Sequence, residues 1–277
     1  MMREGRLRSI LLTTLTVVLV MVYLFPVIWL YLAALKPPQD IVGAPLDLLP
    51  RSVTLDNFVR MWQAVGFQAA LRNSLIVSLV SAAIATTVAL MAAFSLSRFR
   101  YRLRGVFATT ILAMQMLPGI VMVVPLIVIL RGLRLTDNMV GLTFAYLLLG
   151  LPVAVWMLKG YMDEIPLALD EAAMMDGALP WQVLTLIVIP LMAPAIVAVA
   201  AFAFMLAWGE YLFALALMTS VDAKTLPLAL QAALGRYTID WGMLTAGGVL
   251  ISIPPTVLFI YFQRYLISGL TAGSVKG

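Results

Sequence analysis

The 277-residue chain contains neither cysteine nor histidine. Without cysteine there are no disulfides and no thiol chemistry, and the compartment stays undetermined by this test. Without histidine there are no histidine metal ligands, no imidazole acid–base catalysis and no Ser-His-Asp triad. The G-x-x-x-x-G-K-[ST] pattern of a phosphate-binding loop is also missing. We therefore expect no cofactor, no metal site and no enzymatic activity, and no ATP binding by that route.

Charge is scarce as well. Charged residues make up 11% of the chain, whereas a soluble domain contains about 25%. Hydrophobic residues make up 63%, which favours lipid over water as the surrounding solvent. The formal net charge is +5, but the cations lie beside apolar runs, so a role in orienting the chain in a membrane is favoured over nucleic-acid binding.

Six apolar segments are long enough to cross a bilayer as helices, since a span needs about 20 residues. Their runs are continuous, unlike the short alternating segments of a barrel, and a helix satisfies its backbone groups within the segment. The first run follows Arg3, Arg6 and Arg8 but is too long for a signal peptide. The sequence predicts an all-α integral membrane protein, a six-helix bundle in one domain over 1–277, with spans at about 10–35, 74–96, 106–130, 139–158, 190–217 and 244–266.

The basic residues predict an orientation. Arg98, Arg100, Arg102 and Arg104 crowd the short link between the second and third spans. Short basic loops stay inside the cell, so this link and both termini are expected to be cytoplasmic in a multi-pass plasma-membrane protein. The loop over 36–72 is then external, and it is either a plain connection or carries a short interfacial helix after Thr54.

A polar stretch between the fourth and fifth spans is longer than a turn requires. Asp163 and Glu164 are acids suited to a helix N-terminus, and Pro166 suits a first helical position. Gly177 suits a left-handed stop, and Pro180 opens another helix. The sequence predicts a cytoplasmic helix over about 166–176, followed by a glycine turn and a second helix.

One face of this cytoplasmic helix carries small and polar side chains. Leu169, Ala172, Ala173 and Asp176 share that face by helical spacing, and Glu171 lies beside it. Two small alanines would let a partner approach the backbone closely. The residues alone leave two readings open: a docking surface for a partner, or an amphipathic helix resting on its own protein or on the membrane.

The same segment resembles the cytoplasmic-loop motif of permeases of ABC importers. The matching positions are Glu171-Ala172-Ala173, Gly177, Ile187, Ile189 and Pro190, with Ile189 where that family usually has Leu. The resemblance to carbohydrate (maltose-type) importers, and to their smaller permease subunit, extends over 34–36, 55–58, 72–75, 97–100, 176–178, 208–214 and 269–277. It implies that this helix is a coupling helix that docks on a separate ATP-hydrolysing subunit.

The resemblance also implies a set of partners. These are an ABC ATPase dimer that binds the ATP, a second permease subunit and an extracytoplasmic solute-binding protein, in the inner membrane of a bacterial-type cell. It implies inward movement of a disaccharide or oligosaccharide by alternating access. It implies that the tail, with Thr271, Gly273 and Lys276, contacts the ATPase pair, whereas the residues alone favour a frayed terminus.

Glu210 is the one acid well inside a predicted span. Ionisable residues there usually face a bundle interior or water, so Glu210, with Tyr211, either lines a translocation path or makes a packing contact. Two other functions are alternatives for an apolar chain of this length. An ion-coupled secondary transporter would need several embedded charges, and a membrane enzyme would need paired reactive groups; the sequence offers neither.

Overall fold

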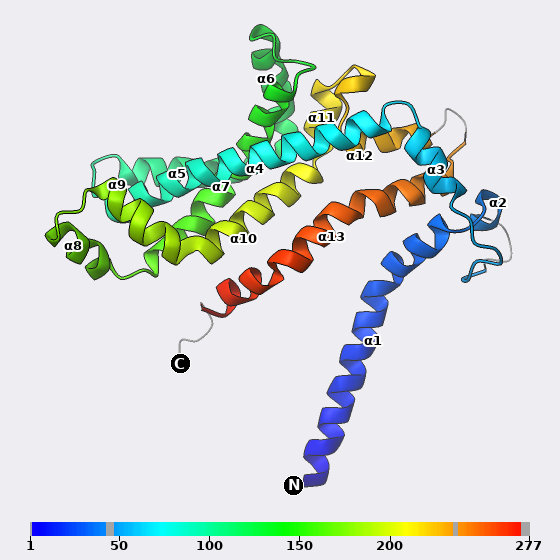
Figure 1. The fold of residues 1–277 in the computed structure, drawn as a ribbon, viewed down its shortest axis with the longest axis horizontal. Helices are drawn as coiled ribbons and strands as arrows, with labels where there is room; N and C mark the ends of the chain where they lie inside the picture. The colour runs from blue at the N-terminus through cyan, green and yellow to red at the C-terminus, as the bar shows by residue number, and fades with distance from the viewer. Residues whose placement is uncertain (1, 43–46, 235–237, 273–277) are drawn as a thin grey trace. The chain divides into compact units, whose positions relative to one another are not determined.

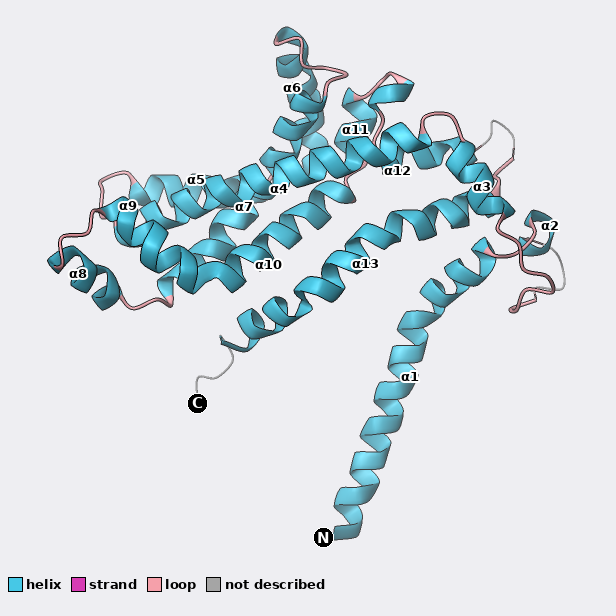
Figure 2. Ribbon diagram, in the orientation of Figure 1, coloured by secondary structure: helices cyan, strands magenta, loops and turns pink. Residues whose placement is uncertain are grey.

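The computed structural model describes residues 2–42, 47–234 and 238–272, and their regular structure is helical (Figure 1, Figure 2). An isolated bridge pairs Leu234 with Ile239, and the described residues form no strand. The helices in chain order are α1 Met2–Ala34, α2 Pro38–Ile41, α3 Asp56–Gln63, α4 Phe67–Arg98, α5 Arg104–Gln115, α6 Gly119–Gly132, α7 Met139–Asp163, α8 Leu167–Met175, α9 Pro180–Val183, η1 Leu184–Val188, α10 Ile189–Trp208, α11 Leu212–Leu217, η2 Val221–Ala223, α12 Leu226–Ala229, η3 Leu230–Ala233 and α13 Trp241–Ala272.

The described residues contain five helical stretches that are long and apolar enough to cross a membrane, and a sixth if α5 and α6 count as one. The prediction of an all-α membrane protein is confirmed. The single continuous helix predicted over 106–130 is wrong, because α5 and α6 bend by 105° at their junction. Pro118 explains the break: it is extended, with ψ of 129°, and a proline disfavours helical backbone in the residue before it.

The predicted span over 190–217 is also interrupted. Its helix ends at Trp208, and the six-residue α11 starts anew at Leu212. At its other end the helical stretch begins earlier than predicted, at Pro180, and runs through a π-helical turn into α10. Pro190 lacks an N–H and its ring would clash with the carbonyl four residues back, so the wider turn just before it relieves that clash.

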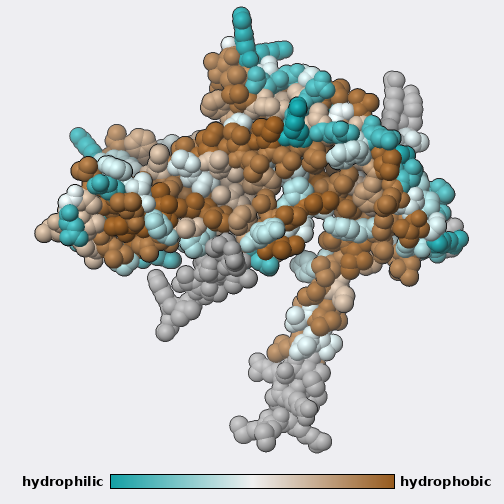
Figure 3. All heavy atoms as spheres, in the orientation of Figure 1, coloured by the Kyte–Doolittle hydropathy of each residue, from teal (hydrophilic) through white to brown (hydrophobic). Residues whose placement is uncertain are grey.

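The chain forms two compact units, Met1–Phe67 with Leu230–Ile253, and Gln68–Ala229 with Pro254–Gly277. In the second unit α4, α7 and α10 lie side by side (Figure 1). Ala89, Ala93 and Ala154 are fully buried between them, and such small residues let membrane helices approach closely. Large apolar side chains remain exposed along the same helices, as the brown surface of Figure 3 shows. This pattern suits helices whose outer faces meet lipid.

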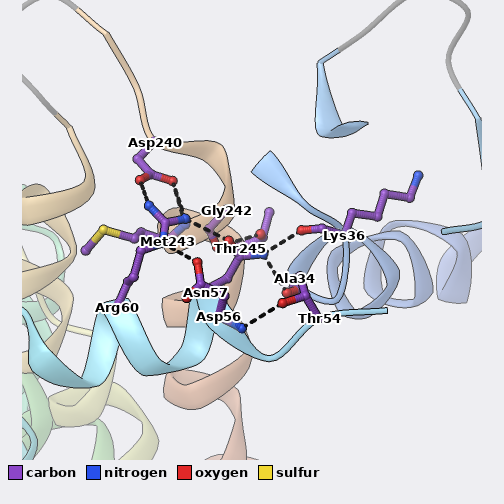
Figure 4. A network of polar contacts seen from close by, with 10 residues as sticks. All are labelled: Ala34, Lys36, Thr54, Asp56, Asn57, Arg60, Asp240, Gly242, Met243 and Thr245. Carbon is purple, nitrogen blue, oxygen red and sulfur yellow. Dashed lines mark hydrogen bonds and ion pairs between the residues drawn. The ribbon is translucent and has the colours of Figure 1, made fainter. Parts of the chain in front are cut away.

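The first unit is held by a polar cluster that we name the Asn57 network (Figure 4). The buried Asn57 side chain donates hydrogen bonds to the carbonyls of Ala34, at 2.9 Å, and Lys36, at 2.7 Å. Its oxygen accepts a bond of 2.8 Å from Arg60, and Arg60 pairs with Asp240. Asn57 and Arg60 belong to α3, so a short helix does follow Thr54, and it ties the end of α1 to the start of α13.

The first prediction concerns two glycines of α7. A Cβ at Gly141 would lie 2.0 Å from the backbone oxygen of Leu135, whereas a Cβ at Gly150 would meet no atom within 4 Å. Gly141→Ala should destabilise the protein by about 1–3 kcal/mol, the usual cost of overpacking. Gly150→Ala is the matched control and should leave stability unchanged or slightly higher. Thermal unfolding in detergent measures both, and equal stabilities would contradict the prediction.

The second prediction concerns Asp240 and acid. Burial opposes its ionisation, but hydrogen bonds from the Met243 N–H and from Arg60 outweigh burial and hold the pKa of Asp240 below 3.8. The Asp240 carboxyl group therefore binds a proton more tightly in the unfolded chain than in the folded protein. Its ionised form stabilises the fold above about pH 4, and this stabilisation is lost as the pH falls through the pKa of the folded state.

Asp240→Asn should therefore lower the unfolding temperature by about 2–4 °C at neutral pH, and this difference should shrink in acid. Thermal scans of both proteins across the acid range measure the effect. Asp222→Asn, at an exposed side chain of η2, is the control and should behave as the parent at every pH. A difference in unfolding temperature between Asp240→Asn and the parent that grows in acid would contradict this prediction.

Candidate functional site

The candidate site is centred on α8, Leu167–Met175. Pro166 precedes the helix as its N-cap, one position before its predicted place. The end is as predicted: Gly177 has a φ of +89° and its N–H donates to the Met174 carbonyl at 3.1 Å. The Ala178 N–H donates to the Ala173 carbonyl at 2.9 Å, which completes a Schellman motif.

Pro180 opens α9 as expected, and the Leu179 N–H donates to the Gln182 side chain at 2.7 Å. The predicted role of Asp163 and Glu164 is wrong. Asp163 is the last residue of α7 and Glu164 is its C-cap, so neither lies in the first turn of α8. Asp163 accepts bonds from Ser97, at 2.6 Å, and from Lys159, at 2.5 Å, and so joins the ends of α4 and α7.

A buried ion pair fixes α8 to the transmembrane helices. Arg98 Nε lies 2.5 Å from Asp170 Oδ2, and the two side chains are 7% and 6% exposed. Arg98 also donates to the Ile165 carbonyl at 3.1 Å. Sequence reasoning missed this pair. The available signal was an acid at position 170, one helical turn before Ala173, because such spacing places both residues on the same side of the helix.

The residues predicted for docking divide between the two sides of α8. Leu169, Glu171, Ala172, Asp176 and Gly177 are exposed. Ala173 is half-buried and packs against the core formed by α4, α7 and α10, so it does not belong to the exposed face. Beside the exposed residues lie two large apolar side chains that the sequence analysis did not select, Met175 at 87% and Trp181 at 61% exposed.

Together these features make an exposed face with apolar and acidic side chains, carried on a short helix with fixed ends. Buried ion pairing sets the orientation of that helix, and the Schellman turn sets the angle at which the chain leaves it. The described residues contain no group of three or more Asp and Glu that could hold a metal ion. An exposed face of this kind, on a helix with fixed ends, suits contact with another macromolecule.

Glu210 does not lie inside a helix as predicted. It falls in the break between α10 and α11, where its carboxylate accepts bonds from the Phe213 N–H, at 3.0 Å, and the Ala214 N–H, at 3.3 Å. Tyr146 donates its hydroxyl to the Glu210 carbonyl at 3.5 Å. The acid thus caps α11, which accounts for a carboxylate at this depth. Tyr211 follows it and is partly exposed.

Thr271 belongs to the last turn of α13. Gly273 and Lys276 are outside the described residues.

Comparison with known proteins places the chain in a family. Residues 85–271 match the model of the binding-protein-dependent transport system inner membrane component. The diacetylchitobiose uptake system permease protein DasC of Streptomyces coelicolor is 34% identical over 94% of this chain and 95% of its own length. The trehalose/maltose transport system permease protein MalG of Thermococcus litoralis is 34% identical over 100% of both chains.

A solved structure shares the fold. It is a chain of a bacterial ABC transporter involved in the import of the acidic polysaccharide alginate, matched with a TM-score of 0.81 over 95% of this chain and 98% of that chain at 21% identity. The family match and the two permease relatives support a transport permease over an ion-coupled carrier. The chain belongs to the family of inner-membrane components of binding-protein-dependent transport systems, and it is a multi-pass permease of an ABC importer.

Proposed function

We propose that this permease moves a disaccharide or oligosaccharide into the cell by alternating access, driven by ATP hydrolysis on a separate subunit. The uptake systems of its relatives DasC and MalG are named for diacetylchitobiose and for trehalose and maltose, which supports a carbohydrate substrate. One observation supports the assignment of ATP hydrolysis to a separate subunit. The helix α8 is exposed and held in place by a buried ion pair, and the chain that carries it has no phosphate-binding loop.

The exposed face of α8 docks on the ATPase in this proposal. Its contact residues are Leu169, Glu171, Ala172, Asp176 and Gly177, and Ala173 supports them from behind. Met175 extends the face, because a long apolar side chain exposed to 87% gains most from burial by a partner. A glycine in the left-handed region cannot be replaced without strain, so the angle at which the chain leaves this face depends on Gly177.

The orientation follows from the basic link after α4. Arg100, Arg102 and Arg104 lie in or beside that link, close in sequence to the Arg98 that holds α8. Basic residues in short links favour the cytoplasmic side, so α8 and both termini face the cytoplasm. The ATPase is a dimer, and a second permease supplies the other docking helix. A loaded solute-binding protein docks on the external loops, and Thr271, Gly273 and Lys276 of the tail reach the ATPase pair.

Alternating access requires two arrangements of the bundle whose balance the ATPases shift. The breaks after α5 and after α10 are suited to this, because discontinuous helices are typical of transporter paths. Glu210 and Tyr211 lie at the second break. The capping bonds of Glu210 favour a positioning role there, in which the carboxylate fixes α11 beside the path.

The third prediction tests docking. Glu171→Lys and Leu169→Asp should each reduce co-purification of the ATPase in detergent by about tenfold or more, since loss of a central interface contact costs about 2 kcal/mol. Glu164→Lys makes the same charge change at the exposed C-cap of α7 and should leave the complex intact. Retention of the ATPase by both α8 variants, at normal expression, would rule out docking through this face.

The fourth prediction separates the two roles considered for Glu210. Glu210→Ala removes the acceptor for the Phe213 and Ala214 N–H groups and should cost about 1–2 kcal/mol of stability, as loss of a helix cap does. Glu210→Gln keeps an acceptor oxygen and should retain stability and most sugar uptake. Uptake abolished in Glu210→Gln, with a stable and assembled complex, would show instead that the negative charge itself is required.

A further inference from the structure

The contact between α8 and α4 contains a buried ion pair. Among the described residues, α8 also lies against α9. A cavity of about 410 Å³ opens between α8 and the end of α4, lined by Phe94, Arg98, Arg100, Asp170 and Glu171 among others. Ala173 is the residue of α8 that packs on the apolar core shared by α4, and the Arg98–Asp170 pair is the polar link between the two helices.

A buried ion pair by itself adds little net stability to the contact between two helices. Removing two charges from water costs several kcal/mol for each, and a well-packed apolar pair of similar volume is often at least as stable. What the pair supplies is a specific partner, because removing either member would leave the other charge buried and unpaired. Arg98 contacts two acceptors: its Nε lies 2.5 Å from Asp170 Oδ2, and a terminal N–H donates to the Ile165 carbonyl at 3.1 Å. The end of α4 thus holds α8 both at its middle and just before its start.

The pair gives α8 a third mechanical connection. Through the chain itself α8 is joined to α7 by residues 164–166 and to α9 and α10 by the turn at Gly177. Neither connection reaches α4. The contacts of Arg98 carry a displacement of α8 directly to α4, which spans Phe67–Arg98, and the packing of Ala173 supports them.

We infer that Arg98 and Asp170 are positioning residues that couple α8 to α4, so that a displacement of α8 by the ATPase moves the cytoplasmic end of α4. This inference rests on the proposed function and adds the route taken by the movement. Without the Arg98–Asp170 pair the ATPase would still bind and hydrolyse ATP. However, α4 would no longer follow α8, so hydrolysis would drive little transport.

The test uses the whole complex, purified and reconstituted in proteoliposomes. Asp170→Asn removes one charge of the pair, and Arg98→Met/Asp170→Leu removes both, so that no unpaired charge stays buried and folding is preserved. Lys159→Gln is the matched control, because Lys159 pairs with Asp163 within the single helix α7. The readouts are ATPase co-purification, ATP hydrolysis, and uptake of labelled maltose or trehalose per ATP hydrolysed.

A second readout needs no sugar. This chain has no cysteine, so within it spin labels attach only at the introduced Met91→Cys on α4 and Ala168→Cys on α8; it is labelled before assembly with its partners. The distance between these labels should be the same with and without ATP in the parent complex, because the two helices move together. In the double variant it should change when ATP binds.

We expect both pair variants to retain the ATPase and its hydrolysis, and to lose about tenfold in uptake per ATP, a coupling loss of ordinary size. The control should match the parent. Unchanged coupling in the double variant, or a label distance that stays fixed in it, would overturn the inference and leave the proposed function standing. A parent complex that brings down no ATPase would overturn the proposed function itself, and the inference with it.

Discussion

Every backbone N–H and C=O in a hydrocarbon environment must find a partner within the protein. Long helices meet that requirement by themselves, and this structure shows what happens where they stop. Asn57 donates hydrogen bonds to the carbonyls at the end of α1, and Asn73 donates to the carbonyls of Asp222 and Lys224. Ser74 accepts from the Leu226 N–H, and Glu210 accepts from the start of α11.

These side chains explain why so few polar residues are enough for the fold. Each one stands beside an interruption of a helix and satisfies groups that would otherwise be unpaired. Asp137 does the same outside the spans, where its carboxylate accepts from the N–H groups of Thr219 and Ser220. Burial opposes its ionisation, and these bonds nevertheless hold the pKa of Asp137 below its ordinary value. These particular polar side chains thus stabilise the places where helices end.

Features that depend on local chemistry could be predicted from the sequence. The length of the apolar runs predicted the membrane-spanning helices, and Gly177 predicted the end of α8. Both signals lie in or beside the segment whose structure they determine. The break at Pro118 had a local signal in that proline, which the prediction did not use, whereas the break after Trp208 had none that the length of the apolar run reveals. Asp163 was misplaced because an acid that suits a helix start also suits bonds from Ser97 and Lys159. The partner of Asp170 lies 72 positions earlier, in another helix, and no local pattern reveals such a pairing.

The π-helical turn at Leu184–Val188 has a consequence for how such chains tolerate insertions and deletions. A π turn holds about one residue more than an α turn, and each residue of a helix adds about 100° of rotation and 1.5 Å of rise. Loss of one residue there would restore an uninterrupted α-helix and leave the direction of α9 and α8 about the axis of α10 nearly unchanged, because the wider turn already absorbs the extra residue. Loss of a residue within α10 would instead rotate α9 and α8 by about 100°, so this one turn is where a change in chain length disturbs the cytoplasmic helix least.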